Sequence, residues 1–438
     1  MSRFSELLSI HIQNSGKNKV QIAGAIGMPR TNLQKISTGS RRPTDEQTVE
    51  KIMNELILSV KDREELWEAY FNDAIGSNVY GEYRECVQLL NAFYLTAETL
   101  PSAYDGFIEE SLPKEIMKFQ SHFELIQTIQ MICQQKMDVN KDKVCLLLQP
   151  DKSLLLHQLL SMIRKFSTIS MEHVICFDHH NELNIGYAQK NLKKMRNIID
   201  FMLVSNNYQA YYYYDYSDIH FGTTSLFPNI ILIGKYLICF DEMETKGFVT
   251  TNKDLYDMYY DRFLHIKNYS TSLFDRCNFT IYEAFAVKKR YYIVYQPLLH
   301  LKKADQDVMF LTKDGLLHYV KETKKKEKDE VIQRYDTLKI LKEQMVTYGN
   351  IFVIKDINLI LDKKGTFVLE SSHQYVFYKM NEDGSSVRIK EQSVLNAMHK
   401  FLLYLPNSVM CLPKEESIMY MIYVIQEFRI QYPWIKEF

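Results

Sequence analysis

Residues 19–44 read KVQIAGAIGMPRTNLQKISTGSRRPT, and this stretch decides the fold of the first part of the chain. Its apolar and glycine positions fall at helical spacing: Ile22, Ala23, Gly27, Leu33 and Ile36. The spacing predicts two short helices, over about 18–26 and 30–38, that cross closely at a small residue. A glycine between them allows the positive φ that a tight turn needs.

Helical periodicity extends on both sides of this stretch. Before it, a helix ending near Ser15-Gly16 is predicted from four apolar positions: Phe4, Leu7, Leu8 and Ile12. After it, the segment 45–75 shows two apolar stripes, formed by Val49, Ile52, Met53, Leu56 and Ile57 and then by Leu66, Trp67, Tyr70 and Phe71. We therefore expect an all-α domain over residues 1–75.

The stretch resembles the phage-repressor type of helix-turn-helix, known as the XRE family, over about residues 4–60. The apolar-Ala pair, the turn glycine and the apolar third-helix positions of that family are present, as is its Gly-x-Arg-x-Pro ending at 39–43. Two positions depart from the family: Lys19 stands where Gln is usual, and Pro29 where Ser or Thr is usual. Lysine can contact a phosphate and proline is tolerated at a helix start. The resemblance implies a DNA-binding transcriptional regulator of bacterial or phage origin.

The resemblance also implies which residues contact DNA. The positions that meet base edges are Arg30, Thr31, Gln34 and Lys35. Arginine pairs well with guanine, and glutamine with adenine. The positions expected on phosphates, which fix register without reading sequence, are Lys19, Asn32, Arg41 and Arg42. The alternative is a helical module that has lost DNA binding, but such a surface has no need to stay basic.

Charge is distributed unevenly along the chain. Residues 1–44 hold seven Lys and Arg and one acidic residue, Glu6, for a net charge of +6. The whole chain carries −1, so the remaining 394 residues carry −7. A basic module on a mildly acidic body is typical of a DNA-binding domain joined to another part.

Bulk composition limits the remaining possibilities. The length of 438 residues suggests about two to four domains. No apolar run approaches the roughly 18 residues that span a bilayer, and the start of the chain lacks a signal-peptide pattern. We therefore expect a cytoplasmic protein that does not enter a membrane. The seven cysteines are scattered without CxxC spacing, so we expect no disulfide framework, no metal site and no cofactor.

From residue 113 onward, apolar strands alternate with helices, which predicts an α/β body with a mixed sheet buried on both faces. We divide the chain into four parts: a helix-turn-helix domain (1–75), a helical connector (76–112), an α/β unit (113–277) and a second α/β or α+β unit (278–438). A connector helix near 80–98 could pack against another copy in a dimer. We find no internal repeat.

Single elements of the body are also predicted. We expect a long helix over 113–136, strands over 281–288, 316–320 and 357–361, and a Tyr-rich strand over 209–216. Alternation would send the tyrosine rings of that strand to both faces of the sheet. We favour a strand packed on both sides over an aromatic wall of a ligand pocket.

One string resembles a catalytic metal motif. Asp178-His179-His180 matches the metal-binding string of DHH phosphoesterases. Those enzymes also need an earlier DxDxxGS loop, which is incomplete here because Phe71 stands at the first Asp position. A polar turn between a strand and a helix, in which Asp178 or Asn181 caps the helix, is the simpler interpretation.

A second string fits the HxKxxxxD spacing of phospholipase D: His300, Lys302 and Asp307. Only one copy is present, whereas that chemistry needs two. A degenerate, non-catalytic relative of that fold stays open. There is no Walker-type loop, GxGxxG, GxSxG or HExxH, so we expect no enzyme.

These observations predict a sequence-specific DNA-binding transcriptional regulator with a C-terminal α/β sensor or dimerisation region. Its expected partners are double-stranded DNA, a second copy of the chain, and a small-molecule or peptide effector. A dimer is expected because two-fold symmetry matches a palindromic operator. The alternatives are a DNA-targeted, metal-dependent phosphoesterase-like enzyme and a non-catalytic oligomerisation scaffold.

Overall fold

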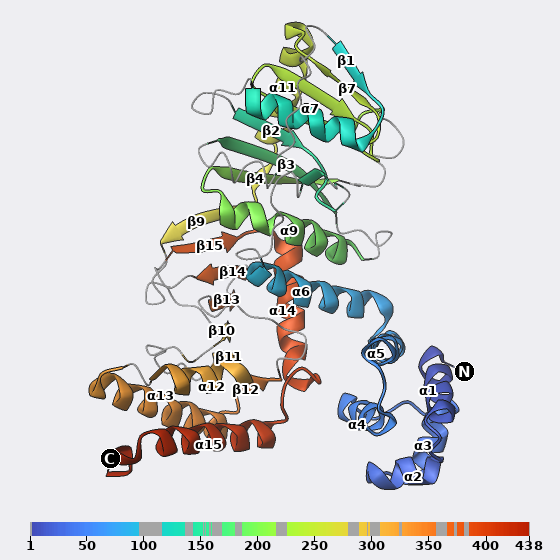
Figure 1. Ribbon diagram of the computed structural model, residues 1–438, viewed down its shortest axis with the longest axis vertical. Helices are drawn as coiled ribbons and strands as arrows, with labels where there is room; N and C mark the ends of the chain where they lie inside the picture. The colour runs from blue at the N-terminus through green and yellow to red at the C-terminus, as the bar shows by residue number, and fades with distance from the viewer. Residues whose placement is uncertain are drawn as a thin grey trace.

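The computed structural model describes most of the chain. The described residues are 2–95, 116–135, 143–151, 153, 155–156, 159, 169–179, 186–215, 226–278, 289–295, 297, 307–323, 326–355, 366–371, 375–380 and 385–437. An N-terminal helical region is followed by a mixed α/β body with two sheets, as predicted (Figure 1).

Helices account for the N-terminal region. They are α1 (Arg3–Asn14), α2 (Lys19–Ala25), α3 (Arg30–Ser37), α4 (Glu46–Leu56), α5 (Val60–Ile75) and α6 (Ser77–Leu95). The first three begin and end within about two residues of their predicted bounds. The Asn18 side chain accepts hydrogen bonds from the amides of Val20 and Gln21, and the Gln21 side chain bonds back to the Asn18 amide. This capping box explains where α2 begins.

The predicted apolar stripes of the helices α1 to α5 pack together into one core. Its buried members are Phe4, Leu7, Leu8, Ile12, Ile22, Ala23, Leu33, Ile36, Val49, Ile52, Met53, Leu56, Leu66, Ala69, Tyr70 and Phe71. Ile57 was wrongly expected there, since 81% of it is exposed. It ends α4 with φ +52°, and this left-handed conformation turns its side chain away from the stripe.

The first sheet takes its strands from residues 116–272. Its described strands are β1 (Ile116–Phe119), β2 (Lys143–Leu147), β3 (Ser170–Asp178), β4 (Tyr208–Asp215), β5 (Asn229–Ile233), β6 (Tyr236–Phe240), β7 (Gly247–Thr250) and β8 (Thr271–Ser272). Their order across the sheet is β1-β7-β6-β5-β2-β3-β4-β8. The helices of this unit are α7 (His122–Gln135), α9 (Tyr187–Val204) and α11 (Lys253–Asn268).

The second sheet takes its strands from residues 274–389. Its described strands are β9 (Phe274–Asn278), β10 (Lys289–Val294), β11 (Val308–Thr312), β12 (Ile351–Ile354), β13 (Thr366–Ser371), β14 (Tyr375–Met380) and β15 (Ser385–Ile389). Their order is β12-β11-β10-β13-β14-β15-β9. The helices are α12 (Lys313–Glu322), α13 (Lys328–Thr347), α14 (Gln392–Tyr404) and α15 (Lys414–Gln431), with 3-10 turns η2 (Leu405–Asn407) and η3 (Pro433–Glu437).

The two sheets have the same topology, although no repeat was predicted from the sequence. In each described sheet three strands run parallel in succession, β2-β3-β4 and β10-β11-β12. Antiparallel strands then follow in the same chain order, and the last of them pairs with the strand that starts the unit. In the first sheet the short β8 pairs antiparallel with β4. Its counterpart in the second sheet is an antiparallel bridge between Ile354 of β12 and Cys411. The repeat lies in the connectivity of the strands, so periodicity along the sequence does not reveal it.

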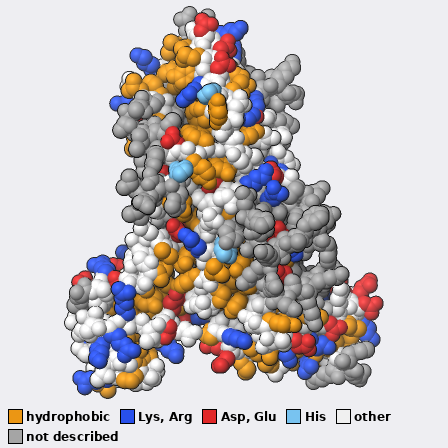
Figure 2. Space-filling model, turned by 180° about the vertical axis from the view of Figure 1, so that it is seen from behind, with side chains coloured by type: hydrophobic (Ala, Val, Ile, Leu, Met, Phe, Trp, Pro, Cys, Tyr) orange, Lys and Arg blue, Asp and Glu red, His pale blue; other side chains and the backbone are white. Residues whose placement is uncertain are grey.

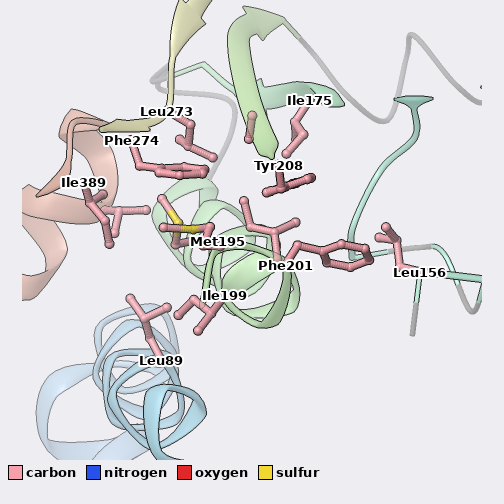
Figure 3. Close-up of a cluster of buried hydrophobic side chains, with 14 of the residues drawn as sticks. Leu89, Leu156, Ile175, Met195, Ile199, Phe201, Tyr208, Leu273, Phe274 and Ile389 are labelled. Atoms are coloured by element: carbon pink, nitrogen blue, oxygen red, sulfur yellow. The ribbon is translucent and has the colours of Figure 1, made fainter. Parts of the chain in front are cut away.

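One continuous hydrophobic core joins the two units. Figure 3 shows α9 at its centre, where Met195 and Ile199 lie among Leu89 of α6, Phe274 of β9 and Ile389 of β15. The apolar face of α6 is thus covered within the chain, by α9 and α14 (Figure 1). The dimer contact predicted for this helix stays a prediction, and it would use a face other than the apolar one. In the second unit, α12 and α13 pack into a separate core. This core lies on the face of the second sheet opposite the shared core.

Several predicted elements of the body are corrected. The segment 113–136 was expected to be one helix, but it contains the edge strand β1 followed by α7. Residues 316–320 were expected to be a strand, yet they lie inside α12, where Thr312 caps the helix by accepting from the Gly315 amide. The strands expected at 281–288 and 357–361 lie outside the described residues. The Tyr-rich strand β4 is confirmed: Tyr212 packs into the shared core, and Tyr211 packs on the opposite face.

Candidate nucleic-acid interface

Helix α3 has one buried face and one exposed polar face. Leu33 and Ile36 are buried in the core of the N-terminal helices. Four of the predicted contact residues are exposed on the other side: Arg30, Thr31, Gln34 and Lys35. Their spacing of one, four and five residues along a helix places them on one face. The helix therefore presents guanidinium, hydroxyl, amide and ammonium groups together.

The start of α3 explains why proline is accepted at position 29. Pro29 occupies the N-cap with φ −59° and ψ 131°, an extended conformation, and no side chain caps the helix. The Pro29 carbonyl accepts hydrogen bonds from the amides of Asn32 and Leu33. A helix N-terminus without a side-chain cap presents amide donors and a positive dipole end, both of which suit a phosphate.

The basic loop after α3 folds back onto the helix. The Arg41 guanidinium donates to the Asn32 side-chain oxygen at 3.1 Å, and the Arg41 amide donates to the Lys35 carbonyl. Gly39 has φ +77°, and a Cβ there would lie 2.8 Å from the Ser5 Oγ. Only glycine therefore brings this loop so close to α1, and the loop places Arg41 beside the exposed face of α3.

The other two predicted phosphate contacts differ in their surroundings. Arg42 is exposed, whereas Lys19 is partly buried and donates through its Nζ to the Ser37 Oγ at 2.8 Å. Lys19 thus ties the start of α2 to the end of α3. Figure 2 shows Lys and Arg side chains gathered over the N-terminal helices, at the lower left.

The N-terminal helices contact the body through α4. The Glu46 carboxylate accepts hydrogen bonds from the Tyr404 hydroxyl and from the Val409 amide, and Glu50 forms a 2.9 Å ion pair with Lys355. Burial raises the pKa of Glu46 to about 7, despite the hydrogen bond from Val409. The body at 404–409 therefore contacts α4, which packs on α2.

The string Asp178-His179-His180 does not present a free carboxylate. Asp178 ends β3 and is buried, and it forms a 2.6 Å ion pair with the fully buried Lys194 of α9. Asp178 does not cap the next helix, because α9 begins after Gly186. The other cap candidate, Asn181, and also His180 lie outside the described residues. Among the residues that are described, no group of three or more His, Cys, Asp or Glu side chains could hold a metal ion.

The phospholipase-like string is only partly described. His300 and Lys302 lie outside the described residues. The Asp307 carboxylate accepts from the Arg290 amide at 3.0 Å. Burial raises the pKa of Asp307, against the lowering effect of that hydrogen bond and of the Arg290 charge. The hydrogen bond from Arg290 ties Asp307, the residue before β11, to β10.

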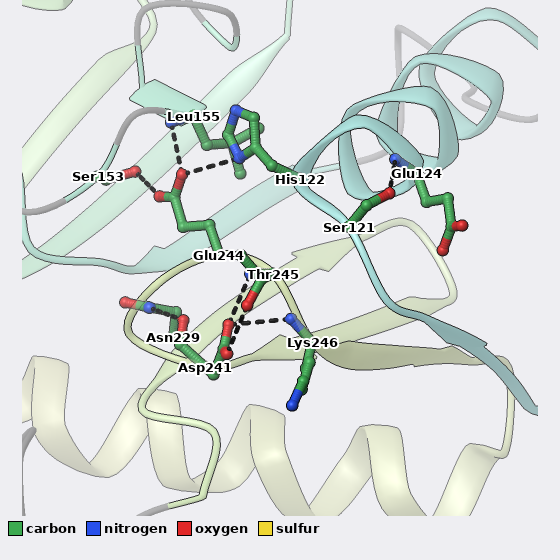
Figure 4. Close-up of polar contacts among 10 residues, drawn as sticks. All are labelled: Ser121, His122, Glu124, Ser153, Leu155, Asn229, Asp241, Glu244, Thr245 and Lys246. Atoms are coloured by element: carbon green, nitrogen blue, oxygen red, sulfur yellow. Dashed lines mark hydrogen bonds and ion pairs between the residues drawn. The ribbon is translucent and has the colours of Figure 1, made fainter.

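A buried carboxylate that sequence analysis missed lies in the first unit. Figure 4 shows Glu244, whose two oxygens meet the Ser153 hydroxyl at 2.5 Å, the Leu155 amide at 3.0 Å and the His122 Nδ1 at 3.3 Å. A Ser-His-acid triad would need the serine hydroxyl on the imidazole. Here the hydroxyl bonds to the carboxylate instead, so Glu244 holds three segments together.

Sequence analysis also missed an aromatic cleft between the N-terminal helices and the body. Its walls come from α5, α6 and the segment 401–410. Residues so far apart in the chain give no local signal.

No family model and no curated protein matches this chain. A solved structure, phosphatidylserine synthase from Haemophilus influenzae Rd KW20, aligns over 80% of this chain and 98% of its own, at 10% identity and a TM-score of 0.21. A TM-score this low carries no argument about fold or function. Within the described residues, no helix is both long and apolar enough to cross a membrane.

Proposed function

We propose that this protein is a sequence-specific DNA-binding transcriptional regulator, in which α3 enters the major groove and the α/β body modulates the affinity. The observation that carries the proposal is the exposed face of α3. It sets Arg30, Thr31, Gln34 and Lys35 side by side over a buried Leu33 and Ile36. A short helix with this arrangement fits the groove width and its hydrogen-bonding groups.

The mechanism follows from the chemistry of these side chains. Arg30 is suited to a guanine edge and Gln34 to an adenine edge, and each good bidentate pair discriminates by about 1–3 kcal/mol. Arg41, Arg42 and the uncapped amides of α3 would hold phosphates on either side. Asn32 would orient Arg41, to which it already bonds.

One module of this size reads one half-site. We propose that two copies of the chain bind a palindromic operator in the cytoplasm, since a two-fold protein matches a two-fold DNA sequence. The body would then supply the dimer contact or the response to an effector. Sedimentation with and without operator DNA measures the number of copies bound.

The electrostatic part of the proposal is tested by fluorescence anisotropy with a labelled duplex, at a series of salt concentrations. Each phosphate contact adds about 0.9 to the slope of log affinity against log salt. Replacing Arg41 and Arg42 by alanine together is expected to reduce that slope by about 1.8. The matched control removes two exposed lysines outside the module, Lys253 and Lys321. An equal change of slope in both variants would contradict the proposal.

A further inference from the structure

A cavity of about 420 Å³ lies where the N-terminal helices meet the body. One wall is α5, another is α6, and the third is the end of α14 with the segment that follows it. The volume is within the range of small-molecule sites, about 300–1,000 Å³.

Aromatic rings form the walls of this cavity. Along α5 and α6, Trp67 stacks on Phe71 with ring centroids 5.2 Å apart, and Phe71 stacks on Tyr80 at 4.8 Å. On the other side, Tyr83 of α6 stacks on Tyr404 of α14 at 4.7 Å. These near-parallel rings are fixed by one another, so the walls are aromatic and preorganised.

The rim of the cavity is charged and on balance acidic. Glu64 and Glu68 of α5 are exposed on it, and they are opposed by one cation, Arg84 of α6. Burial is the main cause of the raised pKa of Tyr80; the Arg84 charge lowers this pKa, and the charges of Glu68 and Glu64 raise it. All three charged groups of the rim therefore act on the interior of the cleft.

We propose that this cleft is an effector site for a small, planar, aromatic cation, whose ring lies against the aromatic walls and whose charge faces Glu64 and Glu68. Ring faces attract cations, and nearby carboxylates add to the attraction. The regulatory role of this site rests on the proposed function, while binding itself does not.

The position of the cleft couples it to the candidate DNA interface. Tyr404 and Val409 line the cavity, and the same two residues hold Glu46 of α4. A ligand that changes the spacing of α5 and α14 therefore acts on the residues that hold α4. By linkage, an effector that changes DNA affinity by some factor has its own affinity changed by DNA by the same factor.

The test uses isothermal titration calorimetry on the full chain with three probes of similar shape. N-methylquinolinium is the cation, quinoline the neutral analogue and naphthalene-2-sulfonate the anion. We expect the cation to bind about tenfold more tightly than the neutral analogue, and the anion more weakly still. Replacing Glu64 and Glu68 by Gln together should reduce cation affinity about tenfold and leave the neutral analogue unchanged. Replacing Glu415 and Glu416 of α15 by Gln is the matched control, since both are exposed and neither lines the cleft.

Circular dichroism shows whether each variant stays folded. We expect all of them to fold, because the substituted positions are exposed. Equal affinity for cation and neutral analogue, or no heat from any of the three probes, would overturn the assignment. Duplex binding of the same samples separates the two proposals. DNA binding without cation binding overturns the effector site alone. Cation binding without DNA binding supports the site and counts against the regulator.

Discussion

The contact between Glu46 and the body predicts a pH-dependent stability that a single substitution removes. Glu46 is buried against Tyr404 and Val409, and its pKa rises from 4.5 to about 7, chiefly through burial. A raised pKa in the folded state means that protonation stabilises the folded protein. The contribution is fully present below about pH 4.5 and is lost as the pH rises through about 7.

Its size follows from the two pKa values. Between about pH 8 and pH 5, this carboxyl group adds about 2.5 kcal/mol to the free energy of unfolding. Glu46→Gln has the shape of the protonated acid and cannot ionise. The variant should therefore lack this increment, and it should be at least as stable as the wild type at about pH 8.

Urea denaturation at the two pH values measures the effect. A Trp434→Phe background leaves Trp67, at the edge of the cleft, as the fluorescent reporter. The buried His173, whose pKa is lowered to about 4, destabilises both proteins equally in acid, so its effect cancels in the difference. Glu6→Gln, at an exposed position on α1, is the control. An unchanged pH dependence in Glu46→Gln would refute the reasoning.

Three further predictions concern the ion pair of the body, the basic loop and the DNA contacts. Lys194→Met removes the buried ammonium group that pairs with the Asp178 carboxylate, so urea denaturation should show a loss of about 3–5 kcal/mol, which adding Asp178→Asn largely restores; no loss would contradict the pairing. Gly39→Ala strains a φ of +77° and brings a Cβ against the Ser5 Oγ, which should lower thermal stability by about 1–2 kcal/mol, and a neutral result would contradict that crowding. Arg42→Ala should weaken binding to operator and unrelated DNA alike, with the salt slope reduced by about 0.9, whereas a change confined to one base position would reassign Arg42 to base reading.

The N-terminal helices could be predicted because their signals are local. Asn18 and Gln21 cap α2, Gly27 closes it with φ +67°, and the buried positions fall at helical spacing. The exception, Ile57, shows the limit of periodicity: it continues the stripe, but the chain has already turned. Its left-handed conformation depends on how α4 joins α5, which no spacing rule contains.

The fold class of the body, a mixed α/β fold, could be predicted, but the arrangement of its strands could not. The edge strand β1 is only four residues long and half-exposed, so its sequence IMKF does not differ from the start of a helix. The two sheets share a topology, but their equivalent strands, such as SMEHVICFD in β3 and VMFLT in β11, have in common only a short apolar run before a polar residue, which is too general to indicate a repeat. Asp178 was singled out as a metal ligand or a helix cap because Lys194, which neutralises it, lies 16 residues later on another element.

Selection of duplexes from a random DNA pool tests the central claim most directly. Wild type is compared with a variant in which Arg30→Ala and Lys35→Ala are combined, at low salt and at several protein concentrations. We predict that the wild type enriches a palindromic motif and that the variant does not. No enriched motif with the wild type, or the same motif with both proteins, would contradict the claim that α3 reads a DNA sequence.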